Sequence, residues 1–296
     1  MTVELTVYGQ TDIGSVRRFN EDAFAIADLT GGRLLEEQRM AQFELGQNGV
    51  LLAVSDGMGG HPAGEVASAL VVDSLRRSMA TLPRGATSDA RLEKATIEAN
   101  REVWQAAHCP GREHMGATLT AVFVHDTTAH IAEVGDSRGY LLRGREIVQV
   151  TRDQSYLQLL LDSGRLSAAE AKECDFSNLA LQAMGLKPEV TVAMARLDLR
   201  RRDCLVLCSD GLSNMLTADE IRHVVLTSAG LDDACVRLID EAKRRGGKDN
   251  ITAVLAGVDG DLPPTVDGER ISRTFFVISE FPPAKTPSAA FGASSS

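Results

Sequence analysis

Leu51-Leu-Ala-Val-Ser-Asp56-Gly57 is an apolar run that ends in Ser-Asp-Gly, and Leu205-Val-Leu-Cys-Ser-Asp210-Gly211 has the same form much later in the chain. Short continuous apolar runs bounded by turn residues are typical of strands that are buried on both faces. The two stretches therefore predict buried strands, and each places a carboxylate where its strand meets the surface.

The same arrangement recurs at other predicted strands, with Asp136 after one and Asp249 and the pair Glu21-Asp22 immediately before two more. A single Asp-Gly is usually no more than a turn. Carboxylates that cluster repel one another unless cations lie between them. Hard divalent cations such as Mg²⁺ and Mn²⁺ take oxygen ligands, and the lack of an accompanying set of histidines disfavours zinc. Together, these residues predict a carboxylate-bound metal centre.

The order of the predicted elements indicates the fold class. Successive strands without regular alternation with helices favour antiparallel pairing, and we expect an α+β protein in which two packed sheets have helices outside. Strands are expected at residues 23–27, 50–54, 118–124, 130–134, 139–143, 204–208 and 251–258. Helices are expected at 64–79, 91–107 and 233–245, and after capping boxes at 167–170 and 217–220.

Composition excludes several classes of function. The 296 residues have a formal net charge of −10, which argues against nucleic acid as a partner. The N-terminus lacks a signal-peptide pattern, and no apolar run is long enough to span a membrane. The five cysteines show no CxxC pair and are interpreted as reduced thiols. We therefore expect a cytoplasmic protein with no membrane partner.

The character of the chain changes after Val258. A cluster of breakers at 260–264 and later prolines predict a catalytic domain at 1–258 and an irregular, partly flexible tail at 259–296. Within the tail, the apolar segment Thr274–Ile278 is either a strand that docks on the domain or a partner-binding segment. The glycine-rich loop at 56–65 either brings the backbone close to a metal or phosphate, with a helix N-terminus beside it, or is a plain flexible loop.

Six stretches resemble one family in type and order: 11–22 (TDIGSVRRFNED), 54–61 (VSDGMGGH), 116–120 (GATLT), 134–140 (VGDSRGY), 209–212 (SDGL) and 247–252 (GKDNIT). Together they resemble the metal-dependent protein phosphatases of the PPM class, the type 2C serine/threonine phosphatases, in their bacterial form. The resemblance extends over about residues 8–257. It implies a four-layer α/β/β/α sandwich of two mainly antiparallel sheets. It also implies hydrolysis of phosphoserine and phosphothreonine by a metal-bridging hydroxide, without a covalent phospho-enzyme.

The resemblance also implies roles for the acidic residues. Two Mn²⁺ or Mg²⁺ ions would be held at the core site, with a third ion beside them. The implied roles are a bridging ligand at Asp56, a carbonyl ligand at Gly57, direct ligands at Asp210 and Asp249, carboxylates at Glu21 and Asp22 that hold metal-bound waters, and a third-ion position at Asp136 with Asp210.

Two basic side chains complete the implied site. Arg17 would grip two phosphate oxygens with its fork. Arg18 is the adjacent alternative, but the spacing to Asn-Glu-Asp favours Arg17. Some relatives have a histidine directly after the Asp-Gly pair, where this chain has Met58. His61 would take its place and protonate the leaving oxygen. A metal-bound water as the acid, and a structural or helix-capping His61, are the alternatives.

The chain departs from its relatives at Gln154, where many have His, and at Leu181-Gln182, where many have Thr-Arg. Both lie beside the implied flap, at about 153–186. The expected partners are phosphorylated proteins, the substrates of a serine/threonine kinase, in bacterial signalling, and the chain is expected to be a monomer. The alternatives are a partner-switch module dedicated to one phosphoprotein and a non-catalytic relative; a nuclease is disfavoured by the acidic charge.

Overall fold

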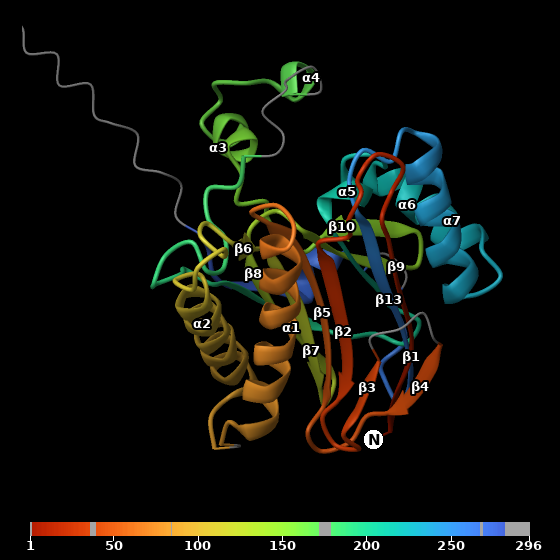
Figure 1. The fold of residues 1–296 in the computed structure, drawn as a ribbon. Coiled ribbons are helices and arrows are strands. Elements are labelled where there is room, and N and C mark those ends of the chain that lie inside the picture. The colour runs from red at the N-terminus through yellow and green to blue at the C-terminus, as the bar shows by residue number, and fades with distance from the viewer. Residues whose placement is uncertain (1, 36–39, 84, 172–178, 267–268, 282–296) are drawn as a thin grey trace, which may run out of the picture.

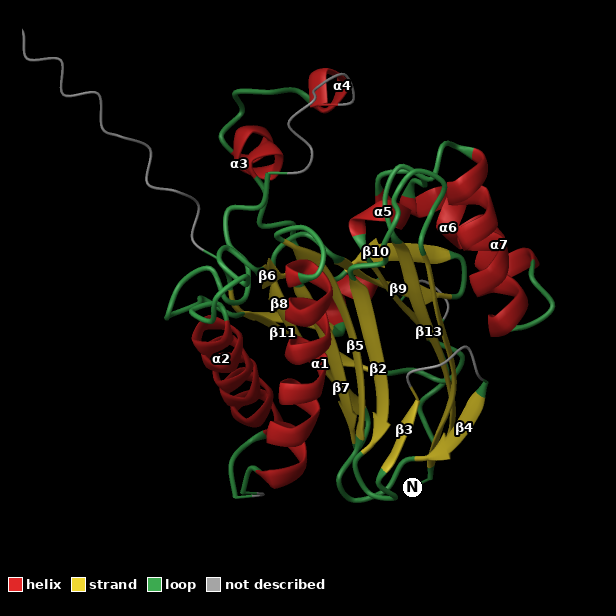
Figure 2. Ribbon diagram, in the orientation of Figure 1, coloured by secondary structure: helices red, strands yellow, loops and turns green. Residues whose placement is uncertain are grey.

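The structure, a computed structural model, describes residues 2–35, 40–83, 85–171, 179–266 and 269–281. Two β-sheets pack face to face, and helices cover the outer face of each (Figures 1 and 2). The strands of both sheets pair in antiparallel fashion. The expected α+β fold, a four-layer α/β/β/α sandwich, is confirmed.

Among the described residues, the larger sheet has eight strands and the smaller has six. The larger runs in the order β14 (Phe275–Ser279), β11 (Ala193–Asp198), β8 (Thr128–Val134), β7 (Leu119–His125), β5 (Val50–Met58), β2 (Asp22–Asp28) and β3 (Arg33–Leu35), with β6 (Gly116–Ala117) also paired to β5. The smaller runs in the order β10 (Glu146–Gln149), β9 (Arg138–Arg143), β12 (Cys204–Cys208), β13 (Ile251–Gly260), β1 (Val3–Asp12) and β4 (Ala41–Glu44).

Helices form the two outer layers and the region above one end of the sandwich. The larger sheet is covered by α1 (Ala63–Thr81) and α2 (Ser88–Ala106), and the smaller by α5 (Asp210–Ser213), α6 (Ala218–Thr227) and α7 (Leu231–Arg244). The short helices α3 (Tyr156–Asp162) and α4 (Ala168–Ala171) lie apart from both layers, and a 3₁₀ turn at Ile271–Arg273 precedes β14. The capping box at Thr217–Glu220 opens α6 as predicted.

The central strand β5 shows why its sequence is apolar throughout. Leu52 and Val54 lie in the core between the two sheets, whereas Leu51 and Ala53 lie in the core under α1 and α2. All four side chains are fully buried, and burying a leucine contributes about 1.5–3 kcal/mol. A strand buried on both faces reads as a continuous apolar run, so the interpretation of this stretch is confirmed.

Antiparallel pairing brings the acidic strand ends to one end of the sandwich. Asp22, at the start of β2, is the register partner of Asp56, near the end of β5. Cys208 at the end of β12 pairs with Ala253 near the start of β13, so the residues just beyond, Asp210 and Asp249, lie at the same end. The register of the sheets therefore assembles the predicted cluster.

Several elements were not predicted. Strand β1 was missed although Val3, Leu5 and Val7 alternate with polar residues and face the core. Strand β11 was also missed. The apolar segment at 274–278 forms the edge strand β14, which confirms the docked-strand alternative and places an ordered element inside the predicted irregular tail. Residues 282–296 of that tail and Cys174 lie outside the described residues.

The cysteines and the helices can be described within the same ranges. Cys109, Cys204, Cys208 and Cys235 are free thiols there, and the last three are buried. No helix in this part of the chain has the length and apolar character needed to cross a bilayer.

Candidate metal centre

Five of the predicted carboxylates, Asp22, Asp56, Asp136, Asp210 and Asp249, take part in a set of electrostatic interactions at the end of the sandwich. Loss of solvent raises the pKa of Asp22 to about 7, and neighbouring Asp210 and Asp249 add to this. Loss of solvent likewise raises the pKa of Asp56 well above its usual range, with Asp22, Asp210, Asp249 and Asp136 adding to the shift. Because each carboxylate disfavours ionisation of the next, the cluster requires positive charge to be fully ionised.

The outer carboxylates behave in the same way. Burial raises the pKa of Asp136 to about 7, and Asp210 and Asp153 contribute, while Arg138 opposes the shift. Burial and the neighbouring Asp249 raise the pKa of Asp210. The structure thus brings Asp136 into the same electrostatic cluster as the other acids.

Backbone and hydroxyl groups hold these carboxylates in place. Thr252 donates a hydrogen bond of 2.7 Å to Asp22 Oδ2, and the Asp22 amide donates to Asn20 Oδ1. The Asp56 amide donates to the Thr118 hydroxyl at 2.9 Å, and the Asp56 carbonyl accepts from the Thr118 amide. These contacts fix the backbone around the cluster.

Two carboxylate oxygens in the cluster lack a partner. Oδ1 of Asp22 and Oδ1 of Asp210 are buried and accept no hydrogen bond from any group in the described residues. An unsatisfied buried acceptor costs roughly 1–3 kcal/mol, more when it is charged. Oxygen donors with unused lone pairs are the ligands that Mg²⁺ and Mn²⁺ select. The residues present therefore fit divalent cations.

The side chains alone do not complete a metal shell. No three described His, Cys, Asp or Glu side chains converge so as to hold one ion by themselves. Asp249 Oδ2 instead accepts a hydrogen bond of 2.7 Å from Arg17. Ligation by Asp249 would require its carboxylate to exchange this guanidinium for a cation. Carbonyl and water oxygens would complete the shell, as at other hard-cation sites.

Arg17 reaches the cluster from the loop between β1 and β2. Its guanidinium donates to Asp249, and the nearby carboxylates of Glu21 and Asp56 also help to raise its pKa. The side chain is about half exposed, with a relative accessibility of 52%. Arg17 therefore presents a solvent-accessible fork beside the buried acids.

Asn250 holds that loop, and sequence reasoning gave it no role. Its Oδ1 accepts from the Glu21 amide at 2.8 Å, and its Nδ2 donates to the carbonyls of Ile13 and Phe19 at 3.0 and 2.9 Å. The side chain is buried, at 4% exposure. The adjacent Asp249 drew attention to this position, but nothing local signals that an amide here binds a loop more than two hundred residues away.

Glu21 and Gly57 lie against the start of α1. A Cβ on Gly57 would overlap the carbonyls of Gly64 and Glu21, so only glycine allows this approach. The Gly57 amide donates to the Glu21 carbonyl at 3.1 Å, and the Ser68 hydroxyl donates to the same oxygen. The glycine in the Asp-Gly pair thus serves close packing beside the cluster, beyond any turn.

His61 is held on two sides at the rim of the cluster. Its ring stacks on Phe19, with centroids 3.8 Å apart and planes 5° from parallel. Its Nδ1 lies 3.2 Å from Glu65 Oε2, which leaves Nε2 as the free ring nitrogen. Phe19 is half exposed, so the stack forms part of the surface next to Arg17.

The two departures in the flap region contact each other. Gln182 Nε2 donates to Gln154 Oε1 at 2.8 Å, and the Gly135 amide donates to the same oxygen at 2.9 Å. Gln154 Nε2 in turn donates to the carbonyl of Glu133. The two glutamines therefore tie the start of the flap region to the turn that carries Asp136.

Comparison with known proteins gives a consistent picture. The family model described as Protein phosphatase 2C matches residues 37–256. The serine/threonine protein phosphatase PstP of Mycobacterium tuberculosis is 36% identical over 260 residues, which are 87% of this chain and 46% of that protein. The serine/threonine phosphatase Stp of Listeria monocytogenes is 34% identical over 258 residues, which are 86% of this chain and 95% of that protein. The chain thus spans about half the length of PstP.

Solved structures show the same fold. The crystal structure of the M. tuberculosis phosphatase PstP/Ppp is 33% identical, with a TM-score of 0.74, and covers 87% of this chain and 100% of that one. The catalytic domain of PstP in complex with two manganese ions is 34% identical, with a TM-score of 0.72 and the same coverage.

Proposed function

The chain belongs to the protein phosphatase 2C family, and we propose that it hydrolyses phosphoserine and phosphothreonine in proteins at a centre of divalent cations. The observation that carries the proposal is the carboxylate cluster with its two unpartnered buried oxygens, on Asp22 and Asp210, beside the exposed fork of Arg17. Phosphate is the anion for which such a combination of bound cations and guanidinium is suited.

We assign the cations to the oxygens of the cluster. Asp56 would bridge two ions, the Gly57 carbonyl would serve one, and Asp210 and Asp249 the other, while Asp22 and Glu21 would hold water in the shell. Bound there, divalent cations supply an activated water and neutralise phosphate charge. The buried cluster itself contributes positioning, since each acid is fixed by hydrogen bonds or by packing at the strand ends.

Arg17 would bind the phosphate group. Its guanidinium now donates to Asp249, and its half-exposed position lets it donate to two phosphate oxygens instead. Asn250 positions this loop through its contacts at Ile13, Phe19 and Glu21. A misplacement of about 1 Å in such a group costs on the order of a hundredfold in rate.

His61 would deliver the proton to the leaving serine or threonine oxygen from Nε2. Glu65 faces Nδ1 at 3.2 Å, which leaves Nε2 as the ring nitrogen that would carry the donated proton. The stacked ring of Phe19 fixes the plane of the imidazole. These contacts favour the acid role over a purely helix-capping one.

The remaining assignments extend the proposal. We infer Mn²⁺ or Mg²⁺ as the physiological ion, and a third ion that Asp136 and Asp210 would hold, because Asp210 contributes to the raised pKa of Asp136. The catalytic domain would span residues 1–258, and the protein would act as a cytoplasmic, bacterial signalling phosphatase. Its substrates would be phosphoproteins made by a serine/threonine kinase, and it would be a monomer.

A phosphothreonine-peptide assay tests the proposal. Phosphate release is expected with Mn²⁺ and is expected to disappear with excess chelator and in Asp56→Asn. Wild-type turnover in Asp56→Asn, with an unchanged melting temperature, would refute the assignment of the cluster as the catalytic centre.

A further inference from the structure

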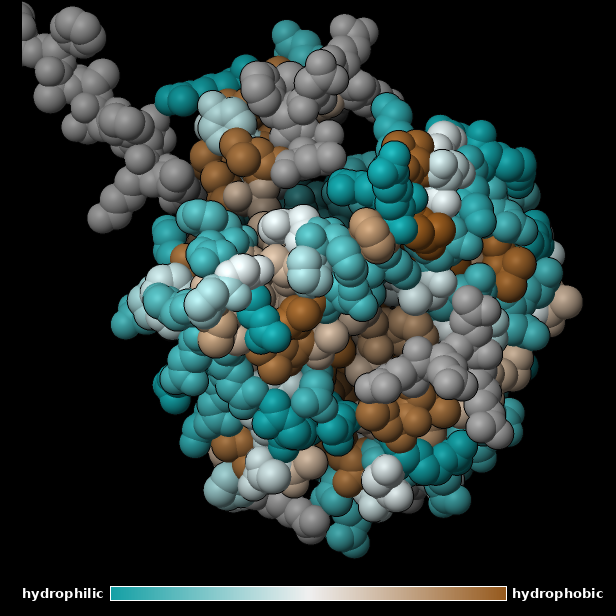
Figure 3. Space-filling model, in the orientation of Figure 1, coloured by the Kyte–Doolittle hydropathy of each residue, from teal (hydrophilic) through white to brown (hydrophobic). Residues whose placement is uncertain are grey.

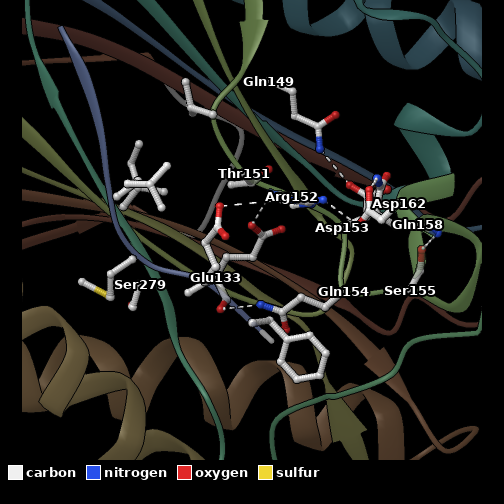
Figure 4. A pocket seen from close by; sticks show the side chains of 18 of the residues that line it. Glu133, Gln149, Thr151, Arg152, Asp153, Gln154, Ser155, Gln158, Asp162 and Ser279 are labelled. Carbon is white, nitrogen blue, oxygen red and sulfur yellow. Dashed lines mark hydrogen bonds and ion pairs between the residues drawn. The ribbon is translucent and has the colours of Figure 1, made fainter. Parts of the chain in front are cut away.

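A cavity of about 800 Å³ lies between the edge of the larger sheet and the flap region, and none of the carboxylates assigned to the metal centre lines it. Its walls come from β8, β11 and β14, from residues 149–155 and from α3 (Figure 4). Cavities of 300–1,000 Å³ with apolar walls are typical of sites for small organic molecules.

The unequal sheets explain why the cavity exists. Strands β11 and β14 form the edge of the larger sheet, next to β8. Ile131, Ala195 and Phe275 face inward there, as part of the core between the sheets or packed against it. Opposite them, the wall is formed by residues 149–155 and α3, a helix in which no residue is fully buried and which carries apolar surface (Figure 3). The apolar inner face of the sheet edge is therefore only loosely covered.

One buried acid in this cavity lacks a full set of partners. Glu133 lies on the same face of β8 as Ile131 and is only 2% exposed. Its Oε2 accepts from the Arg152 amide at 2.8 Å, while its Oε1 is buried and has no hydrogen-bond partner. Burial, with the nearby Asp153, raises the pKa of this carboxyl well above its usual range. A buried acceptor without a partner is costly, so a ligand donor placed here would be favoured.

The other charges of the lining are already paired. Asp153 accepts from Arg138, and Asp162 forms an ion pair of 2.6 Å with Arg152. Arg152 also lies 3.9 Å from Glu280, just beyond β14. Acidic groups thus outnumber basic ones around the cavity, and the unpartnered oxygen of Glu133 is left for an incoming cation.

We propose that this cavity binds a small organic cation with an apolar body, whose ammonium group pairs with Glu133 and whose body packs against Ile131, Val277 and Phe275. The apolar walls supply the burial energy. Glu133 holds its proton in the free protein and releases it to solvent when the ammonium pairs with it, and the carboxylate so formed supplies selectivity for positive charge. The lining contains none of the carboxylates assigned to the metal centre, so binding does not depend on the proposed phosphatase activity.

Dansylcadaverine tests the proposal, because it joins an apolar fluorescent body to one primary amine. Its N-acetylated analogue has the same body without the charge. Fluorescence titrations of the full chain are made in excess chelator, so that the metal centre plays no part. Saturable one-to-one binding of the amine is expected, about tenfold or more tighter than that of the acetylated analogue, which is the factor expected for one charge-assisted hydrogen bond.

Three variants locate the site. Glu133→Gln is expected to remove the preference for the amine while leaving the acetylated analogue unaffected. Val277→Trp, on a half-exposed residue that lines the cavity, is expected to block both probes. Ile278→Trp, on the next residue of the same edge strand but outside the lining, is the matched control and is expected to bind as wild type.

Equal affinity of the wild type for the two probes, or no saturable binding of either, would overturn the proposal, and this test needs no variant to fold. Unchanged amine binding in both Glu133→Gln and Val277→Trp would also overturn it, since binding would then lie elsewhere.

Discussion

Asn250→Ala is expected to lower both stability and activity, although no reacting group is removed. The amide side chain binds three backbone groups of the loop between β1 and β2: the amide of Glu21 and the carbonyls of Ile13 and Phe19. The same loop carries Arg17, which reaches Asp249 at 2.7 Å. Loss of Asn250 therefore releases the loop that positions the phosphate-binding fork.

The magnitude follows from these contacts. Each hydrogen bond contributes a net of about 1 kcal/mol, and backbone groups left unsatisfied cost about 1–3 kcal/mol each where water cannot reach them. Because Asn250 is 4% exposed but the loop itself lies at the surface, water will satisfy part of what is lost. We expect a decrease in the free energy of unfolding of about 3 kcal/mol, with a melting temperature lower by roughly 6–12 °C. We expect kcat/KM to fall by about a hundredfold.

Urea unfolding and a phosphothreonine-peptide assay measure the two effects on one preparation. Asn48→Ala is the matched control, because this asparagine donates a single side-chain bond, to the Leu29 carbonyl, in a turn remote from the carboxylate cluster. It is expected to cost about 1 kcal/mol and to leave kcat/KM unchanged. If Asn250→Ala lost less than about 1 kcal/mol and kept wild-type kcat/KM, the positioning role derived from these three bonds would be wrong.

Three further predictions follow from other contacts. Arg17→Lys is expected to lower kcat/KM for phosphothreonine peptides by roughly tenfold to a hundredfold, because an ammonium cannot contact two phosphate oxygens as a guanidinium does. The control Arg18→Lys should keep a kcat/KM near that of the wild type. Equal effects of the two substitutions would contradict the choice of Arg17. The raised pKa of Glu133 means that the folded state holds a proton that the unfolded state releases above about pH 4.5. The free energy of unfolding of the wild type therefore falls as pH rises above that point, whereas that of Glu133→Gln lacks this contribution. In urea titrations, Glu133→Gln should gain stability relative to wild type between pH 5 and pH 7.5. A difference in unfolding free energy that stays constant with pH would refute this. Asp203→Ala leaves the buried guanidinium of Arg143 without its carboxylate partner and is expected to lower the free energy of unfolding in urea by about 3–5 kcal/mol. The control Glu102→Ala breaks an exposed ion pair with Arg77 and is expected to cost less than about 1 kcal/mol.

The local signals in the sequence were enough to predict the strands that carry the site. The runs that end at Asp56 and Asp210 are apolar on both faces because their strands are central, and that pattern is visible in a short window. Strand β1 has a comparable signal in the alternation of Val3, Leu5 and Val7 with polar residues. It was not predicted, because the polar residues between them make the segment resemble an irregular N-terminus.

Other features depend on contacts between distant parts of the chain and have no local signal. Asn250 binds Glu21 across 229 positions, and Gln154 meets Gln182 only because the flap region folds back. The cavity beside Glu133 arises from two sheets of unequal width, which no window of sequence contains. The residues of the acidic cluster could therefore be predicted from the sequence. The groups that position them could be identified only from the three-dimensional structure.

Equilibrium binding of Mn²⁺ to the chelator-treated chain tests the central claim most directly. The carboxylate cluster, with its unpartnered oxygens on Asp22 and Asp210, predicts at least two bound ions per chain in isothermal titration calorimetry. Asp210→Asn is expected to lose one of them together with phosphothreonine hydrolysis. No bound Mn²⁺ in the wild type, or full hydrolysis by metal-free protein, would contradict the account.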